Sequence, residues 1–258
     1  MENRIPGMLA GRRERRLSRS NDHVRKHRPV TASIPGVISV IVPVRGELPE
    51  IAERFREFAA DPRAELLVAD GGGNAKTSEA FRRIGARVLT AEGSRGARLA
   101  AAAREAHGDQ FLFLHSDSRP PEGALDAVAR CLSNGRSAGA FSLAYENAGV
   151  GLRWIAAWAN LRSRWLELPF GDQGIFCRKE AYELAGGFRD LPVCDDLDFV
   201  RRLRRVAPLT ILADKTTTSP RRYRERGQLS QVLVNWRVQA GYFAGVSPST
   251  LERWYNRR

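Results

Sequence analysis

The sequence is poor in cysteine and in long apolar runs. Its 258 residues include three cysteines, Cys131, Cys177 and Cys194, which are scattered, odd in number and without the spacing of a metal site. This pattern excludes a disulfide framework and favours a reduced, cytoplasmic compartment. No apolar stretch approaches the roughly 20 residues that a membrane-spanning helix needs, and the first residues lack the apolar core of a secretory signal.

Common nucleotide-binding loops are missing as well. The loop after the first predicted strand, residues 43–47, is not glycine-rich, which excludes the usual dinucleotide fingerprint. The sequence also holds no Walker A motif, and it lacks the Gly- and Arg-rich loop of sugar nucleotidyltransferases at this position. A nucleotide would therefore be bound by other means.

The net charge of +13 is concentrated in two segments. Residues 1–36 hold nine Lys or Arg and three acids, and residues 201–226 hold nine and two, so these segments carry +6 and +7. Since residues 1–36 lack a periodic apolar pattern, we predict that they form a basic disordered tail. The charge leaves open a basic membrane-surface or nucleic-acid-binding protein. We favour a ligand-binding role for the second segment and predict no sequence-specific nucleic-acid recognition.

From residue 37 onward, predicted strands and helices alternate. The predicted strands are 37–42, 65–69, 86–90, 110–115, 138–145, 174–177 and 211–213, and the predicted helices are 48–60, a short one ending near 84, 94–106, 122–132, 150–167, 179–185, 195–206, 228–244 and 247–255. Four strand–helix units with short connections predict an α/β fold, with a doubly wound, mostly parallel sheet and helices on both faces. We expect one domain over residues 37–258, in which residues 228–258 form C-terminal amphipathic helices.

One predicted helix carries an aromatic stripe. Trp154, Trp158 and Trp165 recur at helical spacing within residues 150–167. Such a stripe usually packs into the core, and we expect that here. A lipid- or acceptor-facing surface is the alternative.

Acidic residues follow two of the predicted strands. Asp117 comes after the apolar run 111–114, and Asp70 ends a strand before the glycines of residues 71–73. Open α/β sheets bind ligands at the carboxyl ends of their strands, so both acids are candidates for a ligand site. Asp117 is suited to hold a divalent cation on a phosphate, and the alternative is a surface acid that merely ends a strand.

A second acidic group precedes a basic one. Asp195 and Asp196 open a predicted helix, where they either favour the helix dipole or include a general base. Arg221 and Arg222 follow, with donors suited to a phosphate leaving group, unless they form a solvated charge run. An acid for a metal, an acid as base and arginines for a phosphate are what displacement at a nucleotide-activated carbon requires.

The order of these motifs resembles glycosyltransferase family 2, the inverting GT-A enzymes that use nucleotide-diphosphate sugars, over about residues 37–258. Residues 38–43 followed by Glu47 resemble the opening strand and its Pro-x-x-Asn-Glu loop, with Gly46 where Asn is usual. Residues 67–72 resemble the loop that places an aspartate, here Asp70, on the nucleobase. Residues 94–98 resemble the Gly-rich segment near the diphosphate, and residues 115–117 occupy the Asp-x-Asp position.

The resemblance also implies roles for the residues that follow. It makes Asp196 the catalytic base, with Asp195 as its neighbour and rival, and places residues 221–223 where related enzymes carry an Arg-Trp motif. Residues 114–117, 171–174 and 201–205 together resemble a small soluble bacterial subgroup associated with arsenosugar biosynthesis. The residues expected to bind the donor are Pro43, Glu47, Asp70, Arg95, Asp117, Asp172, Gln173, Arg221 and Arg222.

The implied function is inverting transfer of a sugar from a nucleotide-diphosphate donor, with a UDP-sugar favoured, to an acceptor hydroxyl. Mn²⁺ or Mg²⁺ would be held by Asp117, with His115 as a second ligand or a ribose contact. Because His115 replaces the first Asp of the metal motif and Gly46 replaces Asn, the alternative is a non-catalytic nucleotide-sugar-binding protein of the same fold. We predict a cytoplasmic protein and leave open a peripheral contact with the inner membrane.

Overall fold

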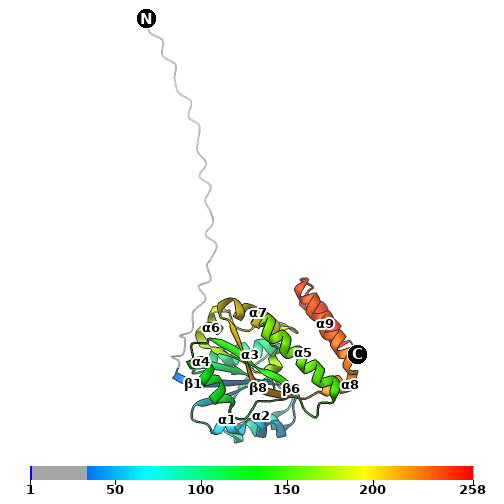
Figure 1. The fold of residues 1–258 in the computed structure, drawn as a ribbon. Coiled ribbons are helices and arrows are strands. Elements are labelled where there is room, and N and C mark those ends of the chain that lie inside the picture. Colours follow the sequence, from blue (N-terminus) through cyan, green and yellow to red (C-terminus); the bar gives the residue numbers. More distant parts are fainter. Residues whose placement is uncertain (2–33, 258) are drawn as a thin grey trace. The chain divides into compact units, whose positions relative to one another are not determined.

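The computed structural model of the chain describes Met1 and residues 34–257, and an eight-stranded sheet forms the centre of the described part (Figure 1). The strand order is β3-β2-β1-β4-β7-β6-β8-β5. The strands are β1 Ile34–Val44, β2 Ala64–Asp70, β3 Arg87–Thr90, β4 Gly108–Phe113, β5 Ser118–Arg119, β6 Ala138–Tyr145, β7 Ile175–Arg178 and β8 Leu209–Thr218.

The first half of the sheet is parallel, as the alternation of predicted elements requires. β1 pairs with β2 and β4, and β2 pairs with β3. The carboxyl ends of these strands therefore lie at one edge, where Val44 is opposite Asp70. The second half is mixed, because β7 runs antiparallel to both β4 and β6, whereas β8 runs parallel to β6.

Helices cover both faces of the sheet, which confirms the predicted α/β class. They are η1 Pro49–Phe55, α1 Arg56–Ala60, α2 Ala75–Arg83, α3 Arg95–Glu105, α4 Ala124–Ser133, α5 Val150–Leu166, η2 Gly171–Gln173, α6 Lys179–Leu184, α7 Asp195–Val206, α8 Arg221–Arg226, α9 Gln228–Phe243 and α10 Pro248–Asn256. Figure 1 shows α1 and α2 on one side of the sheet and α6 and α7 on the other.

The alternation of side chains along β1 explains the two layers. Val40 and Val42 face a core with η1, α1, α2 and α4, whereas Ile41 faces a core with α3, α6 and α7. Every second residue of a strand points to the same face, so a strand buried on both faces is apolar at each position. This is why the central strands are continuous apolar runs in the sequence.

The elements that differ from the prediction include β8 and α8. The predicted strand 211–213 is the ten-residue β8, because its polar residues 214–218 continue the pairing with β6. The basic segment Arg221–Arg226 forms the short helix α8, which lacks buried residues and therefore has no apolar stripe to reveal it.

The predicted tail lies almost wholly outside the described residues, which omit 2–33. Its last residues, 34–36, belong to β1 instead, and the Gly36 N–H donates a hydrogen bond to Asp109 Oδ1 at 2.9 Å. The folded part therefore begins at least three residues before the predicted boundary at residue 37.

The prediction that the tryptophans of α5 pack into the core is wrong. Trp154, Trp158 and Trp165 are 73%, 57% and 80% exposed, and the buried side of α5 consists of Leu152 and small residues instead. That side packs on Leu143 and other residues of β6. None of the described helices is both long and apolar enough to cross a membrane.

Candidate active site

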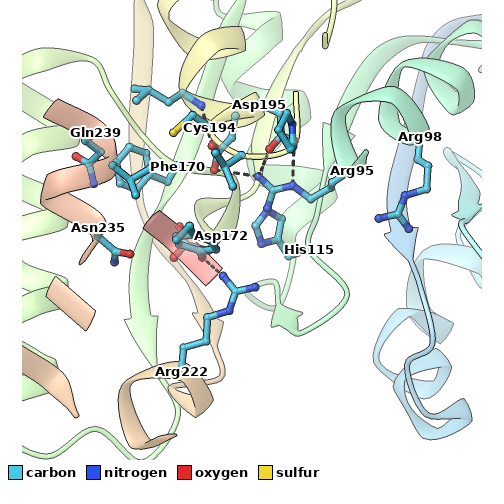
Figure 2. Close-up of a pocket in the computed structure, with 16 residues that line it drawn as sticks. Arg95, Arg98, His115, Phe170, Asp172, Cys194, Asp195, Arg222, Asn235 and Gln239 are labelled. Atoms are coloured by element: carbon cyan, nitrogen blue, oxygen red, sulfur yellow. Dashed lines mark hydrogen bonds and ion pairs between the residues drawn. The ribbon is translucent and has the colours of Figure 1, made fainter. Parts of the chain in front are cut away.

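Two cavities share a wall near the carboxyl ends of β1 and β4. The strand-end cavity, of about 510 Å³, is lined by Pro43, Glu47 and Asp117 around the ends of these strands and by Arg221 of α8. The helix-side cavity, of about 380 Å³, is lined by the first residues of α7 and by side chains of α9 and α10 (Figure 2). Five side chains line both cavities: Arg95, Arg98, His115, Asp172 and Arg222.

Arg95 is the centre of the shared wall. Its Nε and Nη2 atoms donate to the two carboxylate oxygens of Asp195 at 2.9 and 2.7 Å, a bidentate pair whose acid is almost fully buried. Its Nη1 lies 2.7 Å from His115 Nε2, and its Nη2 lies 3.4 Å from Asp196 Oδ2 (Figure 2). Arg95 therefore holds three predicted site residues together, and this positioning uses most of its own donors.

A glycine allows this approach. A Cβ on Gly96 would lie 2.2 Å from the carbonyl oxygen of Arg189 and 3.0 Å from the Cβ of Asp195. Only glycine therefore fits where the start of α3 meets the segment before α7. This contact brings Arg95 within reach of Asp195.

The start of α7 separates its two acids. Cys194, the residue before α7, has φ +60°, a left-handed conformation that residues with a side chain rarely adopt. Asp195 then pairs with Arg95, whereas Asp196 accepts hydrogen bonds from the N–H groups of Gly171 and Leu197 at 2.9 and 2.8 Å. Unusual backbone conformations of this kind are concentrated at functional sites.

Asp196 is an ionised carboxylate on the wall of the helix-side cavity. Burial acts to raise its pKa, but the charge of Arg95 and the N–H of Gly171 outweigh burial and hold the pKa below the usual value. Asp196 is thus kept charged at neutral pH. Its charge, position and fixed orientation suit a group that accepts a proton.

His115 is neutral in this environment. Burial, followed by the positive charge of Arg95, lowers its pKa to about 3. Because an arginine can only donate, we assign Nε2 as the acceptor and place the proton on Nδ1. This arrangement leaves Nδ1 as the atom of His115 that is not engaged by Arg95.

Asp172, which the sequence predicts to bind the donor, lines both cavities. Its Oδ1 atom is buried without a hydrogen-bond partner. Burial and the nearby charge of Asp196 raise the pKa of Asp172 to about 6. A half-buried carboxylate with an unpaired oxygen on a cavity wall is a candidate for contact with a bound ligand.

Replacing Asp172 with Asn is expected to stabilise the protein at neutral pH. The folded-state pKa of about 6 exceeds the unfolded value of 3.8, so the folded state binds the extra proton between these values. The free energy of unfolding of the wild type therefore falls as pH rises through this window. Asn does not titrate in this window. The free energy of unfolding of the variant, relative to the wild type, should therefore be on the order of 1 kcal/mol greater at about pH 7.5 than at about pH 4. Urea unfolding at both pH values measures this, and a pH-independent difference would contradict it.

The adjoining residue Gln173 has a different environment. It is fully buried, its Oε1 accepts from Ser163 and from the N–H of Phe170, and its Nε2 donates to the carbonyl of Phe141 at 2.9 Å. Both polar atoms of the amide thus have partners inside the protein, and the side chain is shielded from both cavities by its burial. The geometry favours a role in holding the loop that carries Asp172 rather than the predicted donor contact.

Asp117 and Glu47 occupy facing loops of the strand-end cavity. Glu47 accepts a hydrogen bond from the Ser116 hydroxyl at 2.7 Å, which ties the loop after β1 to the loop after β4. Asp117 is exposed, and only its backbone carbonyl, which accepts from Arg54 at 3.2 Å, has a hydrogen bond among the described residues. Its carboxylate is thus free for a ligand.

Asp70 lies outside the walls of both cavities. Its Oδ1 accepts from the N–H of Gly72 at 2.7 Å, and its Oδ2 accepts from the hydroxyl of Ser78. These bonds fix Asp70 at the end of β2, next to the loop after β1. Its expected contact with a nucleobase stays a prediction.

Several cavity residues were not identified from the sequence. Arg98 is 7% exposed and donates to the carbonyl of Val44 at 2.5 Å, so it packs under the end of β1. Its position three residues after Arg95 on one helix was the available signal. The helix-side cavity is also lined by Phe170, Asn235 and Tyr255, which come from segments without a recognisable motif. The Tyr255 hydroxyl accepts a hydrogen bond from Arg222.

The family of the chain follows from its sequence over this fold. Residues 39–189, more than half of the chain, match the family described as Glycosyl transferase family 2. The chain belongs to glycosyltransferase family 2. The match identifies the family and does not show the arsenosugar subgroup. No curated protein sequence matches the chain significantly.

Solved structures share the fold. A mannosyltransferase from Pyrobaculum calidifontis, solved with GDP-Man and Mn²⁺, is 19% identical with a TM-score of 0.59, covering 83% of this chain and 65% of its own. TarS residues 1–349 from S. aureus are 20% identical with a TM-score of 0.53, covering 77% of this chain and 65% of theirs. Glucosyl-3-phosphoglycerate synthase from Mycobacterium tuberculosis, in complex with Mn²⁺, UDP and glucosyl-3-phosphoglycerate, is 18% identical with a TM-score of 0.54, covering 77% of each chain.

These likenesses show the GT-A fold that the sequence motifs predicted. The chain spans just under two thirds of the mannosyltransferase and of the TarS fragment, so both contain regions without a counterpart here.

Proposed function

We propose that the protein transfers a sugar from a nucleotide-diphosphate donor to an acceptor hydroxyl, with inversion at the anomeric carbon. One observation carries the proposal: a basic cavity and a cavity with an ionised Asp196 share a wall. Inversion requires the acceptor and the leaving group on opposite sides of the reacting carbon. Two adjoining compartments, one for each partner, fit that requirement, as does the family of the chain.

The strand-end cavity suits the diphosphate leaving group. Arg98, Arg221 and Arg222 line it, and guanidinium groups match phosphate oxygens in geometry and charge. Arg222 is held from the other side by the hydroxyl and the ring of Tyr255. We assign Arg221 and Arg222 to the negative charge that develops as the bond from the sugar to the diphosphate breaks.

Asp196 supplies the base. In the proposed step, the acceptor oxygen forms a bond to the anomeric carbon while the bond from that carbon to the diphosphate oxygen breaks. The hydroxyl proton passes to Asp196, and the electron pair of the broken bond leaves with the diphosphate. Asp195 is less suited to this task, because its carboxylate is almost fully buried and both of its oxygens are paired with the Arg95 guanidinium. The carboxylate of Asp196 is more exposed, at 17%, and its contact with Arg95 is longer, at 3.4 Å.

A divalent cation would fit at Asp117 if the donor supplies the remaining ligands. Within the described residues no three His, Cys, Asp or Glu side chains gather to hold a metal ion by themselves. Mg²⁺ and similar cations are commonly held by one or two carboxylates together with substrate phosphates, and the free carboxylate of Asp117 matches that pattern. The cation would neutralise diphosphate charge. In the assigned tautomer Nδ1 of His115 carries the proton, so it can donate to the ribose. His115 would be a second cation ligand, favouring Mn²⁺ slightly over Mg²⁺, only after Nδ1 loses that proton.

A panel of nucleotide sugars tests the proposed function. Incubation with UDP-, GDP- and TDP-sugars plus Mn²⁺ or Mg²⁺ should give slow hydrolysis of at least one donor, detected as release of the nucleoside diphosphate. A UDP-sugar is the favoured donor. Tight nucleotide binding with no turnover of any donor, with or without added acceptors, would support the non-catalytic alternative instead.

Replacing Asp117 with Asn is expected to weaken nucleoside-diphosphate binding about tenfold or more in the presence of Mn²⁺. The loss should disappear in EDTA, because Asp117 acts through the cation and has no direct bond to the nucleotide. Titration calorimetry with UDP and Mn²⁺ measures both. Affinity that is insensitive to EDTA and to the substitution would show that this cation site does not exist.

The cytoplasmic location, the peripheral membrane contact and the arsenosugar association stay predictions. The exposed tryptophans of α5 support an apolar contact on that side of the molecule.

A further inference from the structure

An aromatic groove of about 400 Å³ lies between α5 and α9, which run beside each other (Figure 1). From α5 it is lined by Trp154, Ile155 and Trp158, and from α9 by Val232 and Trp236. Its volume is within the range of small-molecule binding sites. The groove walls are mostly apolar, unlike the two cavities of the active site.

Helix α9 forms one wall of this groove and is held in place at both ends. At its start, Gln228 packs so closely on Gly151 of α5 that a Cβ on this glycine would lie 2.1 Å from Gln228 Oε1. Near its end, the Tyr242 hydroxyl donates to Asp198 Oδ1 of α7 at 2.9 Å. Between these anchors, the groove-lining residues of α9 are at positions 232, 235, 236 and 239, a spacing that places them on one helix face.

The groove adjoins the helix-side cavity. Phe170, Asn235 and Gln239 line both, so the two spaces adjoin at these side chains (Figure 2). Asp196 lines the helix-side cavity. A single molecule could therefore have one part beside Asp196 and another part in the groove.

The polarity of the combined space changes along its length. Arg162 lies at the groove wall with its guanidinium 3.6 Å from the centre of the Phe170 ring. Its Nη2 atom is buried without a hydrogen-bond partner, as is Asp172 Oδ1 in the helix-side cavity. Buried polar atoms without partners are costly, so these two are candidates for contact with a polar ligand group. Beyond Phe170, the walls are mainly indole rings and aliphatic side chains.

We propose that the groove binds the apolar chain of an amphiphilic acceptor, whose hydroxyl-bearing head lies beside Asp196. The inference rests on the proposed glycosyl transfer and names the class of acceptor for it. A small polar acceptor would leave the groove unused and the tryptophans exposed to water. An alkyl or isoprenoid chain would cover Trp158 and Trp236, which are 57% and 53% exposed.

Alkyl glucosides of increasing chain length test this assignment. Binding of hexyl, octyl and decyl β-D-glucopyranoside is measured by titration calorimetry below their micelle concentrations. The affinity should rise about two- to fourfold per added methylene group, as expected for burial of that group. Trp158→Gln and Trp236→Gln should each weaken decyl glucoside binding about tenfold and reduce the dependence on chain length.

Trp165→Gln is the matched control. Trp165 is on the same helix as Trp158 and is 80% exposed, but it does not line the groove. This variant should bind decyl glucoside as the wild type does. Equal weakening in all three variants would mean adsorption to exposed tryptophans, and equal affinity for hexyl and decyl glucoside would mean that no chain is buried. Either result overturns the proposal.

Nucleotide binding separates this inference from the proposed function. UDP affinity and donor hydrolysis should be the same in the tryptophan variants and the wild type, since none of these side chains lines the strand-end cavity. If the wild type hydrolyses a donor but binds hexyl and decyl glucoside equally well, the acceptor assignment alone is wrong. Chain-dependent binding without hydrolysis of any donor would instead remove the proposed transfer.

Discussion

Replacement of Asp196 by Asn is expected to lower turnover by about 10²–10⁴-fold while nucleoside-diphosphate affinity stays unchanged. The substitution preserves the shape of the side chain but removes the basic oxygen. Donor affinity should be unaffected because Asp196 lines the helix-side cavity and not the strand-end cavity. Steady-state donor hydrolysis or transfer, together with calorimetry of UDP binding, measures both quantities. The low pKa of Asp196 also means that its ionisation should not limit the rate between about pH 5 and pH 8.

Asp195→Asn is the matched control for this result. Asp195 is the adjacent acid, but its carboxylate is buried against Arg95, so its loss should lower the thermal stability as well as the activity. If Asp196→Asn keeps near-normal turnover while Asp195→Asn folds normally and is inactive, then Asp195 is the base. If both variants are active, the mechanism with an aspartate base fails.

Replacement of Arg95 by Met is expected to cost about 3–5 kcal/mol of unfolding free energy. Met keeps much of the apolar stem, but the substitution leaves the buried carboxylate of Asp195 without its bidentate partner. It also removes the positive charge that lowers the pKa of Asp196 and of His115. Both pKa values should therefore rise in the variant.

Urea unfolding of Arg95→Met, Asp195→Asn and the double variant measures this interaction. Once the acid is neutral, removing the arginine should cost much less, so the double variant should be more stable than the sum of the single effects predicts. Additive effects would show that the pair is not coupled. A loss below about 0.5 kcal/mol for Arg95→Met would place it with ordinary surface substitutions and contradict the positioning role.

Much of the site could be predicted because the chain itself places it at strand ends. Asp117 and Glu47 follow β4 and β1, and parallel pairing brings these ends to one edge whatever the details of packing. The acids at residues 195–196 were recognisable from their place at the start of a helix. The positions of these acids could be predicted because they depend only on the direction of the strands and on where the helix begins.

The contacts among these residues could not be predicted in this way. Arg95 was expected at the diphosphate, yet its guanidinium binds Asp195, which is 100 residues away in the sequence. Gln173 was expected at the donor, yet all of its bonds are to neighbouring parts of the protein. A side chain with several donors takes the partners that the fold brings near, and the sequence does not specify these distances.

The tryptophans of α5 show that periodic spacing can predict a helix without predicting which of its faces is buried. Their spacing correctly predicted a helix, but a repeat of large apolar residues does not reveal whether another element covers that face. Here the inward face of α5 consists of Leu152 and small residues, which allow close packing on β6, and the large side chains are left outside. The groove-lining face of α9 was not recognisable, because the helix also carries exposed apolar residues that do not line the groove, such as Leu229 and Leu233.

The sequence by itself determined the α/β alternation, the strands at the centre of the sheet and the acids at their ends, because hydrophobic periodicity and strand polarity are local properties of the chain. Only the tertiary structure decided which acid has both oxygens paired with Arg95 and which acid is the better candidate for the proposed base. It also decided that Asp172 lines two cavities and that α9 forms one wall of a groove beside them. These features depend on side chains from distant segments of the chain that approach within a few ångströms. Such contacts, together with burial, set the pKa values and hydrogen-bond partners of these side chains.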